Sequence, residues 1–196
     1  MLGLEIDFAE AEKFATSIGA AADQIPFALA TALNGSADVT RNLLIRQTWP
    51  GHIHQRNSSF IAASLTTKES RATKGSLSVE IYDRLNRGNL MLHAQGGTRK
   101  PVRGPNLAVP ASDVPRGPRG VPERMRPKNL KDAFKIKDAL YTRDRKGKLK
   151  LVYILKRTTK VPKRVPFFED YAASMSRELH RTIPLAVEHA MATRRR

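Results

Sequence analysis

Arginine and lysine side chains between residues 98 and 130 are the groups whose type and spacing point most directly to a chemical role. Guanidinium and ammonium groups neutralise phosphates, which gives an affinity for nucleic acid that is sensitive to salt and independent of base sequence. The same groups bind acidic protein surfaces. The predicted contact residues are Arg99, Lys100, Arg103, Arg116, Arg119, Arg124, Arg126 and Lys128, together with the C-terminal Arg194, Arg195 and Arg196.

The segment that carries most of these residues is rich in proline and free of aromatic rings. Residues 98–127 contain 7 of the 12 prolines and no Phe, Tyr or Trp, so they lack the stacking platforms of single-strand and RNA binders. A Pro-rich segment of this length spans about 90 Å when extended. Three interpretations stay open: contact with an acidic partner protein, which we favour, contact with the DNA backbone, and a solvated linker. The apolar run Leu107–Pro110 predicts partial order by anchoring on a core.

The net charge of the chain is distributed unevenly along the sequence. The 196 residues include 35 Lys plus Arg and 18 Asp plus Glu, for a formal net charge of +17. Residues 1–97 contain 9 basic and 9 acidic residues, whereas residues 98–196 contain 26 basic and 9 acidic ones. The second half therefore carries the whole imbalance.

Other chemistry is not indicated by the sequence. It contains no nucleophile elbow, no phosphate-binding P-loop motif and no H-E-x-x-H pair. His52 and His54 would share one side of an extended segment, but no third ligand follows at a spacing that suits zinc, and there is no cysteine. Acidic residues are scattered singly. We therefore predict a protein that is not an enzyme and that uses no cofactor, metal or small-molecule substrate.

The elements that must position the basic residues are first of all helices. Apolar residues recur with helical spacing in residues 9–20, in residues 25–47, where Pro26 suits the first turn, and from Pro166 towards the C-terminus. Trp49-Pro50-Gly51 is expected to end the second of these helices. Pro184 is expected to kink or restart the last one.

Strands are predicted where apolar and polar residues alternate with a period of two. The predicted strands cover residues 59–67, 77–83, 133–137, 140–143 and 149–156, and a short helix is expected at about 86–95. The four residues Asp144–Gly147 between the last two strands are typical of a hairpin turn.

These elements predict an α+β fold: a small antiparallel sheet flanked by a long N-terminal helix and a C-terminal helix, with a long extended Pro/Arg-rich arm. We expect one domain over residues 1–196, with residues 98–130 as the arm inserted between its halves. No basic region with an apolar run opens the chain, and no apolar stretch reaches membrane-spanning length. The expectation is a soluble protein made in a reducing cytoplasm, without membrane contact.

Several segments together resemble the minor tail protein Z type of bacteriophage tail-completion proteins and, more loosely, the head-to-tail joining proteins of long-tailed phages. The matching pieces run from about residue 20 to the C-terminus. They are IPFALATALNGSADVTRNLLIRQ, RATKGSLSVEIYDR, HAQGGTRKP followed by LAVP, KLKLVYILK, and VPFFEDYAASMSRELHRTIPLAVEHAM. The Pro-rich stretch VPASDVPRGPRGVPERMRP departs from the simplest version of this pattern.

The resemblance implies a structural virion component at the tail or neck, assembled in the host cytoplasm. It implies a homo-oligomeric ring of six copies at the head-to-tail junction. The implied partners are the tail tube, the tail terminator and head connector or portal-side proteins, with the DNA backbone in a central channel. A basic protein that binds the nucleic-acid backbone outside a virion is the alternative.

Overall fold

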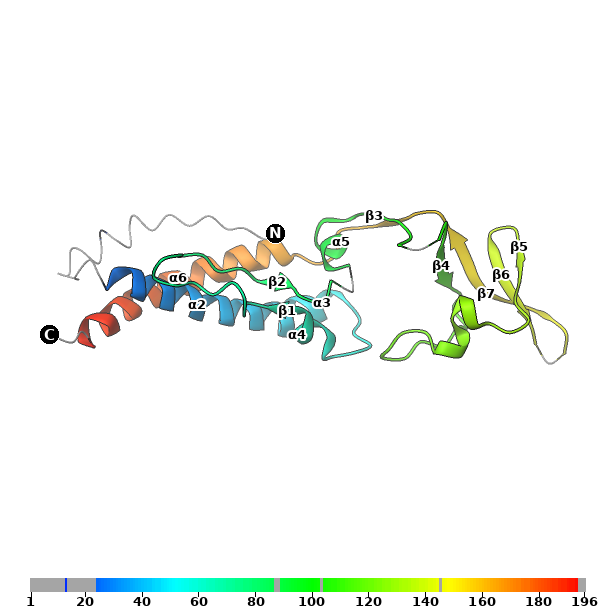
Figure 1. Ribbon diagram of the computed structural model, residues 1–196, viewed down its shortest axis with the longest axis horizontal. Coiled ribbons are helices and arrows are strands. Elements are labelled where there is room, and N and C mark those ends of the chain that lie inside the picture. The colour runs from blue at the N-terminus through cyan, green and yellow to red at the C-terminus, as the bar shows by residue number, and fades with distance from the viewer. Residues whose placement is uncertain (1–12, 14–23, 87–88, 103, 145, 194–196) are drawn as a thin grey trace. The chain divides into compact units, whose positions relative to one another are not determined.

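The computed structural model describes residues 13, 24–86, 89–102, 104–144 and 146–193, and its contacts divide the chain into two compact units (Figure 1). The first, which we call the helical unit, comprises residues 1–53, 59–90 and 165–196. The second, the β unit, comprises residues 54–58 and 91–164. The fold is a mixture of helices and small antiparallel sheets with long N-terminal and C-terminal helices, which confirms the predicted α+β class. That the units fold together as one domain stays a prediction.

The long N-terminal helix begins as predicted and ends later than predicted. It consists of α2 (Ile25–Leu43), the π-helical turn η1 (Leu44–Thr48) and α3 (Trp49–His52). Trp49-Pro50-Gly51 therefore lies inside helical structure, and the prediction that it ends the helix was wrong. Pro50 lies in this continuous helical run, directly after the π-helical turn η1, and does not end the helix. The predicted helix at 9–20 lies outside the described residues.

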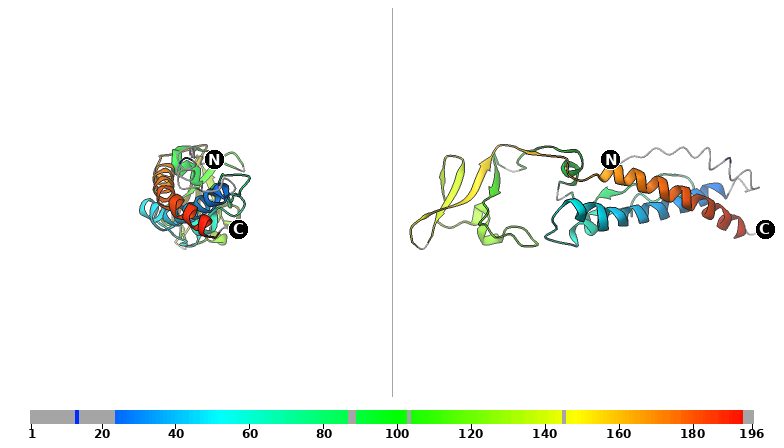
Figure 2. Two further views of the ribbon diagram at one scale, coloured as in Figure 1. Left: turned by 90° about the vertical axis from the view of Figure 1, so that its left-hand side faces the viewer. Right: turned by 180° about the vertical axis from the view of Figure 1, so that it is seen from behind.

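Helix α6 (Phe167–Ala192) is the second long element of the helical unit. It passes through Pro184 as one continuous helix, so the predicted restart does not occur. Figure 2 shows α6 lying along α2 over most of its length. Two hydroxyl pairs join them: Ser36 with Thr182 at 3.0 Å, and Thr40 with Ser174 at 2.9 Å. The later residue of α2, Thr40, pairs with the earlier residue of α6, Ser174, so the two helices are antiparallel.

The small residues of α2 allow this close approach. Ala28, Ala32, Ser36 and Thr40 are spaced four apart and are all buried. Where the start of α2 meets the end of α6, Ala28 packs against Val187 and Ala190. At the other end, the ring of Trp49 stacks on Phe167 with a centroid distance of 5.8 Å.

The first predicted strand pair is much shorter than the sequence suggested. Residues 60–64 form helix α4 (Phe60–Ser64) and only β1 (Leu65–Thr66) is strand; β2 (Tyr82–Asp83) pairs with it in antiparallel register. The predicted strand over 59–67 was wrong because its buried residues Ile61, Ser64 and Leu65 also fit a helical i, i+3, i+4 spacing. Arg41 on α2 donates to the carbonyl oxygens of Ala62 and Leu65 at the C-terminal end of α4.

The β unit is built around a four-stranded antiparallel sheet in the order β4-β7-β6-β5. These strands are β4 (Leu107–Pro110), β7 (Leu149–Lys156), β6 (Ala139–Arg143) and β5 (Phe134–Ile136). Helix α5 (Leu90–Gln95) precedes β3 (Gly97–Arg99), which pairs with β8 (Thr159–Val161). Two 3₁₀ turns, η2 (Glu123–Met125) and η3 (Pro127–Asn129), lie between β4 and β5.

The hairpin predicted at Asp144–Gly147 is confirmed. The Asp144 carboxylate accepts hydrogen bonds from the backbone N–H groups of Lys146 at 2.8 Å and Lys148 at 2.9 Å. Gly147 has a φ of +76°, a conformation that glycine adopts without a steric penalty. The turn between β6 and β7 therefore follows from local sequence alone.

The segment after β4 covers one face of this sheet. Val114, Val152 and Tyr153 form the buried cluster there, and the Tyr153 hydroxyl donates to the Met125 carbonyl oxygen at 2.7 Å. The register between β6 and β7 shifts at Leu140, which leaves Val152 as an extra residue on β7. A bulge of this kind places adjacent side chains on one face, which explains why Val152 and its neighbour are both buried. The predicted anchoring of Leu107–Pro110 is confirmed by its pairing with β7.

Among the described residues, no helix has the length and apolar character that a bilayer-spanning segment requires.

Candidate interaction surface on the β unit

The net formal charge of the chain lies in one of its two units. The helical unit contains 13 basic and 13 acidic residues, whereas the β unit contains 22 basic and 5 acidic ones. The net charge of +17 therefore belongs to the β unit alone. A positive field of this size attracts polyanions and raises their association rates.

The predicted contact residues that the structure describes are exposed and belong to this unit. Arg99 ends β3 and Lys100 follows it, whereas the others lie on the segment that covers the sheet. The exposed set is Arg99, Lys100, Arg116, Arg119, Arg124, Arg126 and Lys128. Arg103 and the C-terminal Arg194, Arg195 and Arg196 lie outside the described residues.

Arg116 has a structural role that the sequence did not indicate. Its guanidinium donates to the carbonyl oxygen of Pro110 at 2.7 Å and to that of Ala111 at 3.4 Å. It thereby holds the covering segment against the end of β4. The segment that was predicted as an arm is thus partly tied to the sheet, while its remaining arginines face solvent.

Most of the predicted cations have no carboxylate partner within the part of the chain that the structure describes. This holds for Arg99, Lys100, Arg119, Arg124, Arg126 and Lys128. Cations that lack internal partners are free to pair with an external anion. The positive field also acts within the unit: burial and then the charges of Arg164 and Arg99 lower the pKa of His93.

The face of the sheet opposite the covering segment is the feature that the sequence analysis missed. Strand register aligns Ile154 with Ala139, and Ala139 with Ile136, so these side chains share one face. On the same face Phe134 lies opposite Tyr141, with ring centroids 6.4 Å apart. We call this the open face; its main side chains are Phe134, Ile136, Tyr141, Leu149, Leu151 and Ile154.

Large apolar side chains remain accessible on the open face. Exposure is 41% for Ile136, 46% for Leu149 and 38% for Ile154. The Arg143 guanidinium lies 5.6 Å from the Phe134 ring centroid, a cation–π contact at the margin of the face. The alternation in residues 134–143 and 149–156 predicts a sheet with two different sides, but it does not show which side stays uncovered.

A polar hollow in the helical unit is the second place where functional groups gather. It has a volume of about 310 Å³ and lies between η1, α3 and α6. Thr48 donates to the Asp170 carboxylate at 2.6 Å, and the Nδ1 atom of His52 lies 2.8 Å from the Thr48 carbonyl oxygen. Thr48 is the last residue of the π-helical turn η1. These contacts join η1 to α6.

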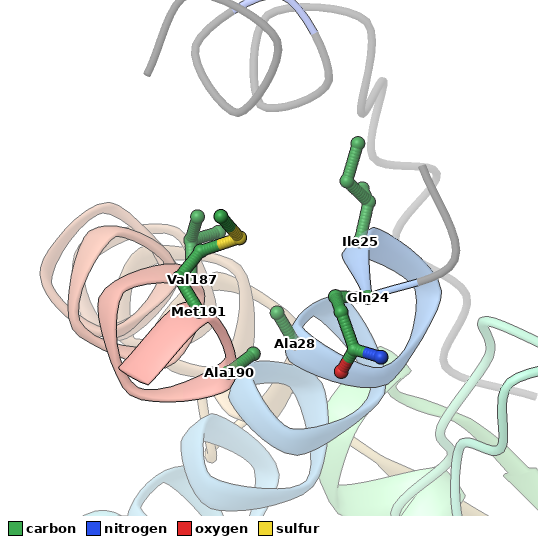
Figure 3. A pocket seen from close by; sticks show the side chains of 6 residues that line it. All are labelled: Gln24, Ile25, Ala28, Val187, Ala190 and Met191. Carbon is green, nitrogen blue, oxygen red and sulfur yellow. The ribbon is translucent and has the colours of Figure 1, made fainter. Parts of the chain in front are cut away.

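Metal binding at His52 receives no support from this geometry. Within the described residues, no group of three His, Cys, Asp or Glu side chains is placed to hold an ion. A further hollow, between Gln24, Ile25 and Ala28 on one side and Val187, Ala190 and Met191 on the other, is apolar and narrow (Figure 3). It is a packing gap between α2 and α6.

Comparison of the chain with protein-family models, with curated proteins and with solved structures finds no match in any of the three.

Proposed function

We propose that this chain is a structural virion protein of a tailed bacteriophage, which forms an oligomeric ring at the head-to-tail junction and completes and joins the tail without catalysis. The observation that carries the proposal is the separation of charge, with a neutral helical unit and a β unit of net charge +17. The resemblance of the sequence to minor tail protein Z supports it independently.

The arrangement suits a subunit that assembles around or beside a polyanion. A neutral helical unit can pack against other copies without charge repulsion, and exposed arginines can face DNA or an acidic neighbour. Contacts of this kind to phosphates fix position without reading base sequence, which is what passage of DNA through a channel requires. The proposed partners are further copies in a six-membered ring, the tail tube or terminator, and connector proteins.

A basic protein that binds the nucleic-acid backbone outside a virion is the second candidate. The observation that favours it is the set of exposed cations without carboxylate partners, such as Arg119, Arg124 and Arg126. A dedicated binder of this kind acts as a monomer or small oligomer, and its affinity for duplex DNA falls steeply with salt.

Mass photometry and negative-stain microscopy of the full chain at rising concentration separate the two candidates. The virion proposal expects closed rings with a central opening. A chain that stays monomeric over the whole range and binds duplex DNA with a steep salt dependence would overturn it in favour of the second candidate.

A further inference from the structure

The free edge of the sheet is next to the open face. Strand β5 is the last strand in the order β4-β7-β6-β5, so the backbone groups on its outer side have no strand partner among the described residues. Its side chains alternate: Phe134 and Ile136 belong to the open face, and Lys135 points to the other side. An edge of this kind is a template for an additional strand.

Another part of the same sequence matches this edge in pattern and in charge. Residues 2–8 read LGLEIDF, so that in an extended conformation Leu4, Ile6 and Phe8 share one side and Glu5 and Asp7 the other. Residues 1–12 contain four carboxylates and no basic residue. This acidic segment is therefore complementary to the β unit, with its 22 basic and 5 acidic residues.

Length allows the segment to reach another molecule. Fifteen residues separate Phe8 from Gln24, which directly precedes α2, and that length of chain spans up to about 50 Å when extended. Pairing of two β5 edges with each other is the competing arrangement. It would bring two units of the same strong positive charge together and place one Lys135 near the other, which electrostatic repulsion opposes.

We propose that residues 2–8 of one copy add as a strand to the β5 edge of a second copy. Leu4, Ile6 and Phe8 then extend the open face, while Glu5 and Asp7 lie beside Lys135. Main-chain hydrogen bonds supply the affinity in this mode of recognition, and alternate side chains supply the specificity. The interaction deepens the proposed assembly into rings, since donation of a segment from each copy to the next is a heterologous contact that can close a ring.

The chain contains no cysteine, so in a cross-linking test a disulfide can form only between introduced cysteines. One chain carries Asp7→Cys and another carries Lys135→Cys, and the two are mixed under mild oxidation. The proposal expects a disulfide-linked pair that contains one chain of each kind. Cross-links mainly between two Lys135→Cys chains would assign the edge to β5–β5 pairing and overturn it. A single chain with both substitutions that closes on itself at every concentration would overturn donation between copies.

Peptide binding tests the strand geometry with a chain from which only residues 1–12 are removed. The partner is the chain shortened to residues 13–196, which keeps every described residue, and the probe is a fluorescent peptide of residues 1–12. Ile6→Lys in the peptide should weaken binding at least tenfold. A peptide of the same composition in scrambled order is the control for charge, and equal binding by that control would overturn the proposal.

Backbone methylation supplies the sharpest version of this test. In an added strand, alternate N–H groups point towards the sheet. Peptides methylated on the amides of Leu4 and Ile6, or on those of Glu5 and Asp7, should therefore differ at least tenfold in affinity. Equal loss or equal retention in both peptides would contradict strand addition, as would displacement of the peptide by single-stranded DNA at the same concentration as by unlabelled peptide.

The outcomes separate this inference from the proposed function. Rings that form normally from the shortened chain, together with no peptide binding, would overturn strand donation and leave the ring in place. Specific peptide binding by a chain that never forms rings would leave strand donation in place and overturn the ring.

Discussion

The helical unit and the β unit use their polar groups in opposite ways. In the helical unit, hydroxyls pair across α2 and α6, and Asp38 forms a two-pronged ion pair with Arg71 at 2.9 Å. In the β unit, the described basic side chains are exposed, and most of those predicted as contacts have no carboxylate partner. These polar groups of the helical unit are paired within the chain, whereas the predicted contact cations of the β unit are exposed and mostly lack a carboxylate partner.

The apolar groups show the same difference. The helical unit buries a long series of residues of α2 and α6, including Leu29, Leu33, Met175 and Leu179. The β unit buries one face of its sheet around Tyr153 and leaves the other open. A unit with one open apolar face and a large net charge is the part that is suited to contact other molecules.

The largest expected loss of stability comes from a substitution in the core of the helical unit. Leu29 is 1% exposed, so Leu29→Ala should lower the free energy of unfolding by about 2–5 kcal/mol through lost burial and a cavity. Ile154→Ala on the open face is the matched change in the β unit and should cost less than about 1 kcal/mol, since water already reaches this side chain. Urea unfolding of both variants checks this. Equal costs would mean that the open face is packed as tightly as the core.

The hydroxyl pair of Thr40 and Ser174 should give the next largest effect. Both side chains are fully buried, so Thr40→Val leaves the Ser174 hydroxyl without a partner and should cost about 1–3 kcal/mol. The double variant Thr40→Val with Ser174→Ala removes both groups and should recover most of that loss. Thermal and urea unfolding of the three proteins tests this. A double variant that is as unstable as the sum of the singles would show that the hydroxyls act independently.

Elements with a strong local signal could be predicted from the sequence. The helix from Ile25, the hairpin at Asp144–Gly147 and the strand at 149–156 each rest on a cap, a turn or a regular period within the segment itself. The continuation through Pro50 and the helix at 60–64 could not be predicted, because both depend on contacts with distant residues. Arg41 on α2, for example, is bonded to the end of α4.

The candidate surface was half predictable for a similar reason. Exposed arginines follow from composition, since charged residues are rarely buried without partners. The open face depends on which side of the sheet the covering segment occupies, and the bulge at Val152 decides which side chains turn inward. Neither feature is encoded within one short segment. Arg116 illustrates the limit, because only its contact with Pro110 distinguishes it from Arg119.

A smaller effect is expected at the buried tyrosine of the β unit. Tyr153→Phe removes the hydrogen bond to the Met125 carbonyl oxygen and should cost about 1 kcal/mol. Burial raises the pKa of Tyr153 above its usual value near 10. The neutral form therefore stabilises the fold below pH 10, and that contribution should be lost as pH rises through the folded-state pKa. The variant should lose less stability than the unaltered chain on passing from pH 9 to pH 12. An equal loss in both would show that Tyr153 does not contribute.

The smallest effect is also the sharpest comparison, because its sign should differ between the two units. Asp38→Asn breaks the exposed ion pair with Arg71 and should destabilise the chain by about 0.2–1 kcal/mol. Arg126→Gln removes one cation that no carboxylate balances, so relief of repulsion should leave stability unchanged or slightly raised. Both differences should shrink at about 1 M salt, where the screening length is about 3 Å. Matched urea titrations at low and high salt measure them. If Arg126→Gln destabilises the chain as Asp38→Asn does, then the positive charge of the β unit is balanced within the molecule. It would then not be available to pair with an external partner.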